Sequence, residues 1–172
     1  SKWYEFSGYV AYGTLDQKFK YSLGLRAFLE KRPHRTMVGM YYKNDNEILG
    51  QSQNGFTTDN ILASVFRITP LRNLTNVKQT YGFFERMWFN GFSTNLSFYN
   101  RIMRPLGTFH YEYYKKPNEI AWKEEITTSE IRLLTRFAYN EKYIDGEFTR
   151  VSLSTHYPIL QVQYTLGIKH LF

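Results

Sequence analysis

Long runs in which apolar and polar side chains alternate one by one are the feature that most constrains the fold of this chain. The clearest run places its apolar residues on one parity, at Phe19, Tyr21, Leu23, Leu25, Ala27 and Leu29. The opposite parity of the same run carries lysine, serine, glycine and arginine. Successive side chains of an extended strand point to opposite faces, whereas a helix repeats about every 3.6 residues. The pattern therefore predicts β-strands with one apolar and one polar face.

Similar alternation recurs along most of the chain, in runs that are separated by turn signals. The longer runs span residues 4–12, 34–43, 77–89, 92–102, 131–139 and 160–168, and shorter ones lie at 108–114 and 148–154. The dipeptides Asn90-Gly91 and Asp145-Gly146 favour tight turns, because these residue types tolerate a positive φ. The pattern predicts about nine strands, several of which reach the ~9–11 residues of a tilted transmembrane strand. Strands of soluble proteins usually stop near ~5–6 residues.

Two polar stretches interrupt the pattern. Residues 44–76 are rich in turn-forming residues such as Asn44, Asp45 and Asn46, and residues 115–127 are similarly polar. A long irregular stretch in an otherwise regular domain is usually functional or simply an extracellular excursion. We therefore expect residues 1–172 to form a single β-barrel segment with a long loop insertion at about 44–76, and a polar connection at 115–127.

Aromatic residues supply much of the apolar character of this chain. The sequence contains 15 Tyr, 14 Phe and 3 Trp, which make up 19% of the chain, although the mean hydropathy is −0.49. Aromatic side chains favour the pleated surface of a sheet and gather at membrane–water interfaces. No stretch approaches the ~20 consecutive apolar residues of a spanning helix. The sequence predicts an all-β fold, an antiparallel meander of long strands that forms part of an outer-membrane β-barrel.

The two parities of each strand have different surroundings in such a barrel, lipid on the outside and a hydrated lumen on the inside. We expect the apolar parity to face lipid, at Phe19, Tyr21, Leu23, Leu25, Leu96, Phe98, Ile131, Leu133, Phe137, Leu160, Val162, Tyr164, Leu166 and Ile168. We expect the polar parity to line the lumen, at Lys18, Lys20, Arg26, Glu130, Arg132, Arg136, Gln161 and Gln163.

No constellation in the sequence indicates an enzyme. Glu124 and Glu125 are adjacent, so in an extended chain they point to opposite faces and cannot flank one substrate bond. The four histidines show no metal-ligand spacing, and cysteine is absent. Neither a Gly-x-Ser-x-Gly elbow nor a glycine-rich phosphate loop occurs. We therefore predict no catalytic residues, no cofactor and no metal.

The net charge of +7 raises the question of a nucleic-acid partner. The basic residues are spread along the chain, and the densest spots are short, at Lys31-Arg32, Lys115-Lys116 and the pair Arg101 and Arg104. Nucleic-acid footprints usually cluster on one face. We expect no nucleic-acid partner, although a basic nucleic-acid binder is a third and weaker hypothesis.

Several segments of the sequence resemble one known family. They include GYVAYGTLD at 8–16, GEFTRVSL at 146–153, and residues 19–21, 41–45, 49–50, 59–62, 91–93, 128–130, 136–139, 141–142, 157–160 and 164–168. The family consists of uncharacterised Gram-negative proteins that join an N-terminal carboxypeptidase-regulatory-like domain to a large outer-membrane barrel. That barrel is similar to those of the surface-antigen superfamily, which includes assembly and translocation factors.

The resemblance implies that this chain is a middle piece of the barrel region of a longer protein, without the regulatory-like domain. Its partners would then be outer-membrane lipid and the remaining strands of the same parent chain, in the bacterial outer membrane. The assembly factors carry an Arg-Gly-Phe tripeptide on a loop inside the barrel, whereas this sequence offers only Asn90-Gly91-Phe92, which we interpret as a hairpin turn, so these residues do not support an assembly role. The family has no established activity, and transport, assembly and surface-related roles all stay open.

Two further readings of the sequence remain. A soluble ligand-binding β-barrel or sandwich with an aromatic-lined pocket would point the aromatic parity inward. A small closed barrel would fit Phe172 and the alternating residues before it, because complete outer-membrane barrels end in such a strand. Fluorescence quenching of tryptophan by lipid-borne quenchers separates the membrane reading from the soluble one, because only a membrane barrel places Trp88 against lipid.

Overall fold

The computed structural model describes residues 2–14, 17–31, 34–48, 74–89, 91–106, 110–116 and 119–169. Within these residues the chain contains only β-strands and their connections, and no helix. The strands are β1 (Tyr4–Gly13), β2 (Lys18–Glu30), β3 (Thr36–Ile48), β4 (Leu74–Phe89), β5 (Phe92–Pro105), β6 (Tyr111–Lys116), β7 (Glu119–Lys123), β8 (Ile126–Ala138), β9 (Lys142–Asp145), β10 (Arg150–Ser154) and β11 (Ile159–Ile168).

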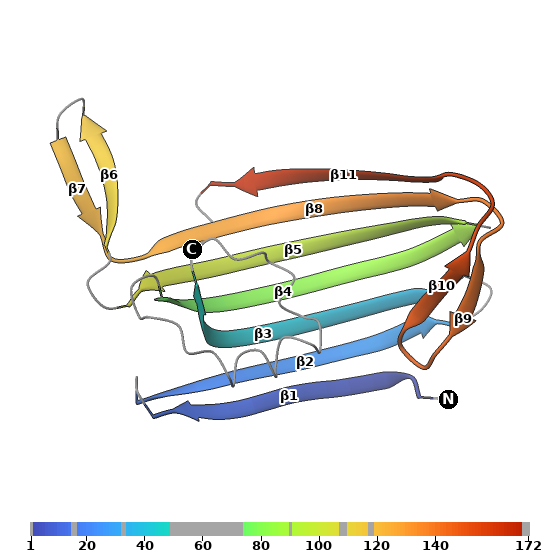
Figure 1. The fold of residues 1–172 in the computed structure, drawn as a ribbon, viewed down its shortest axis with the longest axis horizontal. Coiled ribbons are helices and arrows are strands. Elements are labelled where there is room, and N and C mark those ends of the chain that lie inside the picture. The colour runs from blue at the N-terminus through green and yellow to red at the C-terminus, as the bar shows by residue number, and fades with distance from the viewer. Residues whose placement is uncertain are drawn as a thin grey trace.

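Seven of these strands form one antiparallel sheet in the order β1-β2-β3-β4-β5-β8-β11 (Figure 1). Each strand pairs with the next one along the chain, except that the hairpins β6–β7 and β9–β10 are excursions between neighbours. The seven strands are 10 to 16 residues long. The prediction of an antiparallel meander of long strands is therefore confirmed.

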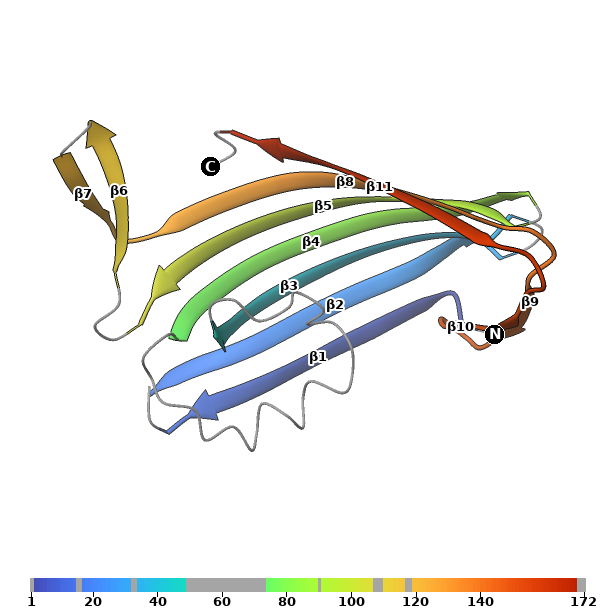
Figure 2. The ribbon, with the colours of Figure 1, turned by 45° about the horizontal axis from the view of Figure 1, so that its top comes forward.

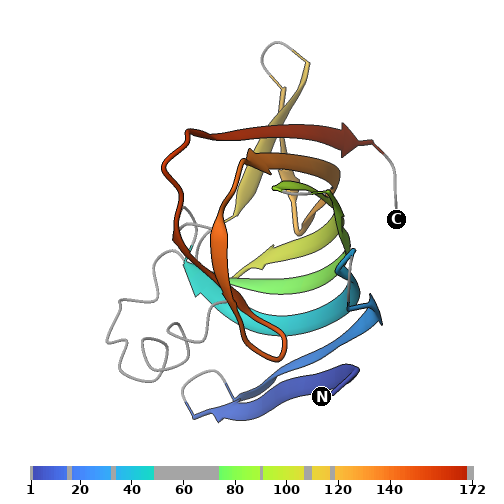
Figure 3. The ribbon, with the colours of Figure 1, turned by 90° about the vertical axis from the view of Figure 1, so that its right-hand side faces the viewer.

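The sheet curls into a trough along the direction of its strands (Figures 2 and 3). Right-handed strand twist gives long antiparallel sheets this kind of curvature. Strands β1 and β11 form the two edges of the trough, and within the described residues they do not pair with each other. The structure therefore contains an open, curved sheet, and no closed barrel is seen among the described strands.

The two hairpins lie at opposite ends of the trough. The β9–β10 hairpin folds over the inside of the sheet near the N-terminus, whereas β6–β7 projects away from the other end (Figures 1 and 3). Phe148, in the turn of β9–β10, packs with Phe28 and Met37 in the one buried apolar cluster that the described residues form, and Phe83 lies against it. This small cluster attaches the hairpin to the sheet.

The strands extend into the stretches for which irregular structure is predicted. Residues 44–48 continue β3 and residues 74–76 begin β4, although Asn44 and Asn46 are turn-forming types. The Asn76 side-chain amide donates hydrogen bonds to the side-chain oxygens of Asn44 (3.0 Å) and Asn46 (3.1 Å). These cross-strand bonds satisfy the amides that would otherwise favour a turn. The rest of the predicted loop, residues 49–73, lies outside the described residues.

The predicted polar connection at 115–127 is wrong, because β7 forms there and β8 begins at Ile126. β7 pairs with β6 as a separate two-stranded hairpin. The rings of His110 and Trp122 meet edge to face across this hairpin, with centroids 5.5 Å apart. A contact between residues on the two sides of a hairpin cannot be predicted from the alternation of residues within one strand.

Gly91 provides a test of the tight turn between β4 and β5. Its φ of +83° is left-handed, and a Cβ there would overlap the carbonyl oxygen of Ala138. We expect Gly91→Ala to lower the free energy of unfolding by at least about 1–2 kcal/mol, because strain and a clash coincide. Urea unfolding in detergent micelles measures this change.

Gly167→Ala is the matched control for that substitution. Gly167 lies in β11 at an ordinary φ, and a Cβ there meets no atom within 4 Å. We expect this variant to be neutral or slightly stabilised, because alanine restricts the unfolded chain more than glycine does. If Gly91→Ala and Gly167→Ala lost equal stability, a side chain at position 91 would cause no specific strain, and the prediction would be wrong.

Candidate functional site

The strand register assigns every residue of the sheet to one of two faces. The β9–β10 hairpin lies on the concave side of the trough (Figure 3), and its Phe148 contacts Phe28 and Met37. The concave face therefore consists of the β2 residues that share the parity of Phe28, together with the residues that pair with them in the other strands. The opposite parity forms the convex face, for which the hairpin provides no cover.

Two neighbouring rows of directly paired residues cross the convex face through all seven strands. The first row consists of Tyr4, Ala27, Val38, Phe84, Leu96, Leu133 and Tyr164. The second row consists of Phe6, Leu25, Met40, Gly82, Phe98, Ile131 and Leu166. We call these fourteen residues the apolar rows. They contain no charged side chain, and their only polar groups are two tyrosine hydroxyls.

Nine of the fourteen residues in the apolar rows are exposed, and the other five are half-buried. Phe6 is 68% exposed, Met40 60% and Leu166 50%. Soluble monomers rarely present a contiguous apolar surface that crosses an entire sheet. Removing each large apolar side chain from water is worth about 1.5–3 kcal/mol when burial is complete. The convex face therefore has a strong tendency to transfer out of water.

In the central strands, polar rows flank the apolar rows on both sides. Thr36, Arg86, Thr94 and Thr135 form one flanking row, and Thr80, Asn100 and Ser129 form the other. On the first side, the indole N–H of Trp88 donates to the Thr94 hydroxyl at 2.8 Å, and the guanidinium of Arg86 lies 4.7 Å from the centre of the Trp88 ring. The apolar surface is therefore a band that polar residues limit on both sides in β4, β5 and β8, and on one side in β3.

All residues predicted to face lipid lie on the convex face. Twelve of the fourteen are exposed, and the other two, Phe98 and Ile168, are half-buried. The parity of each strand alone determines this placement, because no register shift occurs within the pairings of β8 with β5 and β11. Contact of these side chains with lipid stays a prediction.

All residues predicted to line a lumen lie on the concave face. Lys18, Gln161 and Gln163 are exposed there, and the other five are half-buried. The half-buried arginines have acidic partners: Arg26 pairs with Glu5, and Arg132 with Glu130 at 3.1 Å. Hydration of this face stays a prediction.

A row of tyrosines on the concave face is not apparent from the sequence. Tyr41, Tyr81 and Tyr99 are directly paired across β3, β4 and β5, and their rings stack with centroids 5.9 Å and 4.5 Å apart. Gly24, directly opposite Tyr41, leaves room for its ring, and Arg132 lies 4.7 Å from the centre of the Tyr99 ring. Each tyrosine shares a parity with polar residues of its own strand, so only the register reveals the row.

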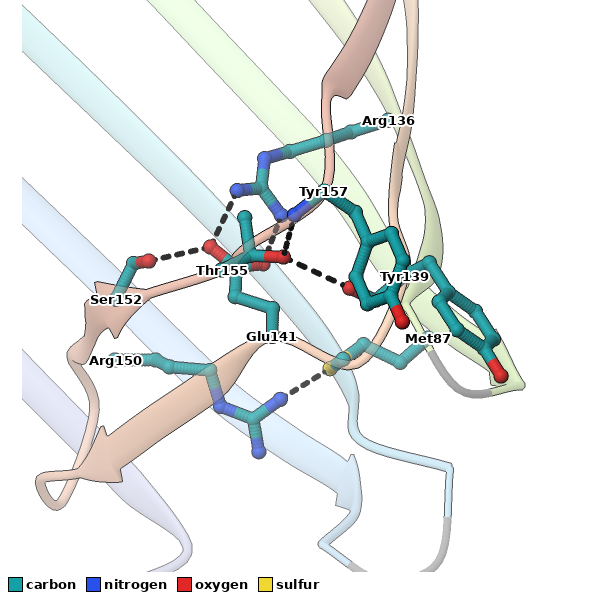
Figure 4. A network of polar contacts seen from close by, with 8 residues as sticks. All are labelled: Met87, Arg136, Tyr139, Glu141, Arg150, Ser152, Thr155 and Tyr157. Carbon is teal, nitrogen blue, oxygen red and sulfur yellow. Dashed lines mark hydrogen bonds and ion pairs between the residues drawn. The ribbon is translucent and has the colours of Figure 1, made fainter.

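An ion pair at the end of β8 anchors the β9–β10 hairpin inside the trough (Figure 4). Arg136 donates two hydrogen bonds to Glu141, each 2.6 Å long, and the Ser152 hydroxyl donates to the same carboxylate. The Glu141 side chain is completely buried. Asn140 has a φ of 52°, which turns the chain back so that Glu141 lies beneath Arg136. A bidentate arginine–carboxylate pair fixes orientation as well as distance.

A second set of contacts holds the turn of the hairpin. Arg35 donates to the backbone carbonyl of Phe148 at 2.9 Å, and the Phe148 ring stacks on Phe28 with centroids 4.9 Å apart. Arg150 pairs with Asp145 and also contacts the sulfur of Met87 in β4 (Figure 4). The hairpin is thus attached to β2, β4 and β8 at once.

Three groups at the hairpin have shifted pKa values. Hydrogen bonds from Arg136 lower the pKa of Glu141 to about 2. Burial, followed by a hydrogen bond with Glu141, raises the pKa of Tyr143. Burial and the neighbouring positive charge of Arg150 lower the pKa of Arg35. These shifts describe a charged network that is used for attachment.

A cleft of about 700 Å³ lies between the turn of the hairpin and the start of the sheet. Its lining includes Trp3, Phe28, Lys31, Arg35 and Asp145. Lys31 lies over the ring of Trp3, and its ammonium donates to the backbone carbonyl of Lys2. Among the described residues, no three His, Asp or Glu side chains are placed to hold a metal ion. Of the charged groups in this cleft, Arg35 joins the hairpin to the sheet through its hydrogen bond to the Phe148 carbonyl.

No family model, curated protein or solved structure matches this chain. The resemblance to the outer-membrane family therefore stays a prediction. Within the described residues, no helix is long and apolar enough to span a membrane.

The buried carboxylate of Glu141 makes the hairpin sensitive to acid. A pKa below the ordinary value of 4.5 means that ionised Glu141 stabilises the fold above pH 4.5, and that this contribution is lost as the pH falls toward about 2. We expect Glu141→Gln to lower the free energy of unfolding by about 1–3 kcal/mol at pH 7, because Arg136 is left without its charged partner. The difference from wild type should shrink between pH 4.5 and about 2, as measured by urea unfolding in detergent.

Glu147→Gln is the matched control on the same hairpin. The side chain of Glu147 is 59% exposed, and it pairs with Lys2 at 3.5 Å. An exposed ion pair contributes little to stability, so we expect the free energy of unfolding to change by no more than about 1 kcal/mol. A Glu141→Gln variant that behaves like Glu147→Gln at every pH would contradict the anchoring role of Glu141.

Proposed function

We propose that this chain forms part of the wall of a β-barrel that crosses the bacterial outer membrane. The single observation that carries the proposal is the pair of apolar rows, to which all seven strands contribute on the face opposite the β9–β10 hairpin. The convex face would contact lipid, and the concave face would line a hydrated interior. A sheet crosses a bilayer only where its backbone groups are paired and its outer side chains are apolar.

The distribution of aromatic residues supports this proposal. Trp3, Trp88, Phe89, Tyr139 and Tyr157 all lie near the strand ends at which the β4–β5 turn and the β9–β10 hairpin are found, and each of them is exposed. The rings of Tyr139 and Tyr157 contact each other at a centroid distance of 5.0 Å. Membrane proteins place amphipathic rings at the interface, where the ring body meets apolar chains and the polar tip meets water.

The concave face supports a hydrated interior. Its charged residues are matched in part by ion pairs, such as Lys43 with Glu47 at 2.8 Å, and its uncharged residues include many serine, threonine and glutamine side chains. Outer-membrane barrels have polar interiors of this type.

A soluble ligand-binding barrel is the second candidate function, and the tyrosine row is the observation that favours it. Aromatic rings on a concave face are typical of ligand pockets. However, the rings of Tyr41, Tyr81 and Tyr99 cover one another, and Arg132 covers the outer side of Tyr99. Only the edges of these rings are therefore left for contact with a ligand. The apolar area on the convex face is larger than the area that these ring edges present. The membrane barrel is therefore the better-supported function.

Quenching of tryptophan fluorescence by lipid-borne quenchers tests the proposal. Two variants of the full chain, reconstituted in vesicles, retain either Trp88 or Trp122 as the only tryptophan. We expect strong quenching of Trp88, whose indole contacts Thr94 of the convex face, and weak quenching of Trp122, which lies on the separate β6–β7 hairpin. Equal weak quenching of both would favour the soluble candidate.

Adjacent substitutions on β11 provide an energetic test. Leu166 belongs to the apolar rows, and its neighbour Thr165 is an exposed residue of the concave face. In vesicles we expect Leu166→Arg to lower the free energy of unfolding by about 2–4 kcal/mol, because a charge would enter the hydrocarbon region. We expect Thr165→Arg to change stability by no more than about 0.5 kcal/mol. Urea unfolding measures both, and a small cost for Leu166→Arg would place that residue in water.

A further inference from the structure

The cleft between the turn of the β9–β10 hairpin and the start of the sheet combines basic side chains with an apolar wall. Its volume of about 700 Å³ lies within the ~300–1,000 Å³ of ligand pockets. Residues from distant parts of the chain line it, at 2–3, 28–31, Arg35, 145–147 and Arg150. The chain start and the hairpin lie close together at this end of the sheet (Figure 2). The cleft therefore exists only when the hairpin is attached to the sheet.

Arg35 is a buried cation whose charge is only partly compensated. Its side chain is 9% exposed. Among the described residues it donates one hydrogen bond, to the backbone carbonyl of Phe148, and its Nε has no partner. The closest carboxylate in this part of the chain, that of Asp145, lies 3.9 Å from Arg35 Nη1, and both of its oxygens accept hydrogen bonds from Arg150. A buried guanidinium is costly without a charged partner of its own.

The charge of the whole lining is positive as well. Its described residues carry one more positive than negative charge, with Lys2, Lys31, Arg35 and Arg150 against Glu30, Asp145 and Glu147. Lys2 pairs with Glu147 at 3.5 Å, so these two charges balance each other. Burial, together with the neighbouring charge of Arg150, lowers the pKa of Arg35, which agrees with an excess of positive charge around it. One negative charge would neutralise the cleft.

Apolar groups lie beside these cations. Trp3 is 52% exposed and Leu29 is 60% exposed, and both line the cleft. The Lys31 ammonium lies 4.5 Å from the centre of the Trp3 ring and 5.5 Å from the centre of the Phe28 ring. The Arg35 guanidinium lies 5.2 Å from the centre of the same Phe28 ring. An anion that carries an apolar part can cover this wall and remove it from water, whereas a small inorganic ion cannot.

We propose that the cleft is a binding site for a singly charged organic anion, in which a carboxylate or a phosphodiester is joined to an apolar body. The anionic group lies against Arg35 and Lys31, and the apolar body lies along Trp3 and Leu29. The inference goes beyond the proposed function and does not rest on it, because no residue of the lining belongs to the apolar rows. Soluble carboxylates and the head groups of anionic lipids share this chemistry, and the experiment distinguishes the two sources.

The fluorescence of Trp3 reports whether the cleft is occupied. In the full chain in nonionic detergent, Trp88→Phe and Trp122→Phe leave Trp3 as the only tryptophan. The probes are cyclohexanecarboxylate, acetate, which has the same charge without the apolar body, and cyclohexylmethanol, which has the same body without the charge. We expect a saturable change with cyclohexanecarboxylate, an affinity for acetate that is at least about tenfold weaker, and no saturable change with cyclohexylmethanol.

Micelles that contain phosphatidylglycerol test the lipid as the source of the anion, with phosphatidylcholine as the control without net charge. Competition of phosphatidylglycerol with cyclohexanecarboxylate, or a response to phosphatidylglycerol alone, identifies a lipid head group as the occupant. A response to cyclohexanecarboxylate without such competition identifies a soluble anion. Either result supports the site. Absence of a saturable response to both anions overturns the inference, and so does equal affinity for acetate or for phosphatidylcholine.

Charge-removing substitutions test the two cations. We expect Lys31→Gln and Arg35→Gln each to weaken binding of the anion at least about tenfold, because each removes a charged donor. Lys142→Gln is the matched control, since Lys142 is an exposed residue of the same hairpin and does not line the cleft, and it should bind like wild type. Arg35 also attaches the hairpin, so Lys31→Gln, which leaves the bond to Phe148 in place, is the independent test. Unchanged affinity in Lys31→Gln would overturn the assignment.

The outcome is separable from that of the proposed function. A saturable anion response together with weak quenching of Trp88 by lipid-borne quenchers would keep the anion site and reject the membrane. Strong quenching of Trp88 without a saturable anion response would keep the membrane and reject the anion site.

Discussion

An apolar sheet face that no second layer covers, among the residues that the structure describes, is the constraint on which this structure depends. Sheets of soluble domains bury their apolar face against a second sheet or against helices. Here the β9–β10 hairpin covers part of the polar, concave face instead (Figure 3). The convex face, with side chains such as Phe6 and Met40 more than half exposed, has no cover within the described residues. Burial of these side chains therefore requires contact with something outside the described residues.

The part of the fold that the sequence predicts well is the part that depends on parity alone. Leu166 and Gln163 are assigned to opposite faces by an odd or even position, and an uninterrupted strand preserves that assignment. The register between strands depends on pairs of residues far apart in the chain, which periodicity does not contain. The stacking of Tyr41 on Tyr81 is of this kind, so sequence analysis of single strands misses it.

Contacts between distant residues decide the local structure at two places, and at the first of them they override local preference. Asn44 and Asn46 favour turns, but hydrogen bonds from Asn76 keep them in a strand. The ion pair between Arg136 and Glu141 depends on the left-handed turn at Asn140, which the sequence does not reveal, although asparagine tolerates it better than most residues. In both cases the deciding contacts become visible only when the strands are in place.

The seven-stranded sheet, which is the wall of the trough, and the β9–β10 hairpin inside the trough need different kinds of residues. The two parts occupy separate segments of the chain. β8 and β11 pair directly from Ala138 and Ile159 onward, so the residues between them leave the sheet without interrupting it. The wall requires alternation, because each residue faces either the convex or the concave side. The hairpin requires specific partners, a carboxylate for Arg136 and an apolar recess for Phe148, because it has to remain inside a polar space. Substitutions in the hairpin can therefore alter the interior while the alternation of the wall, and with it the apolar rows, stays intact.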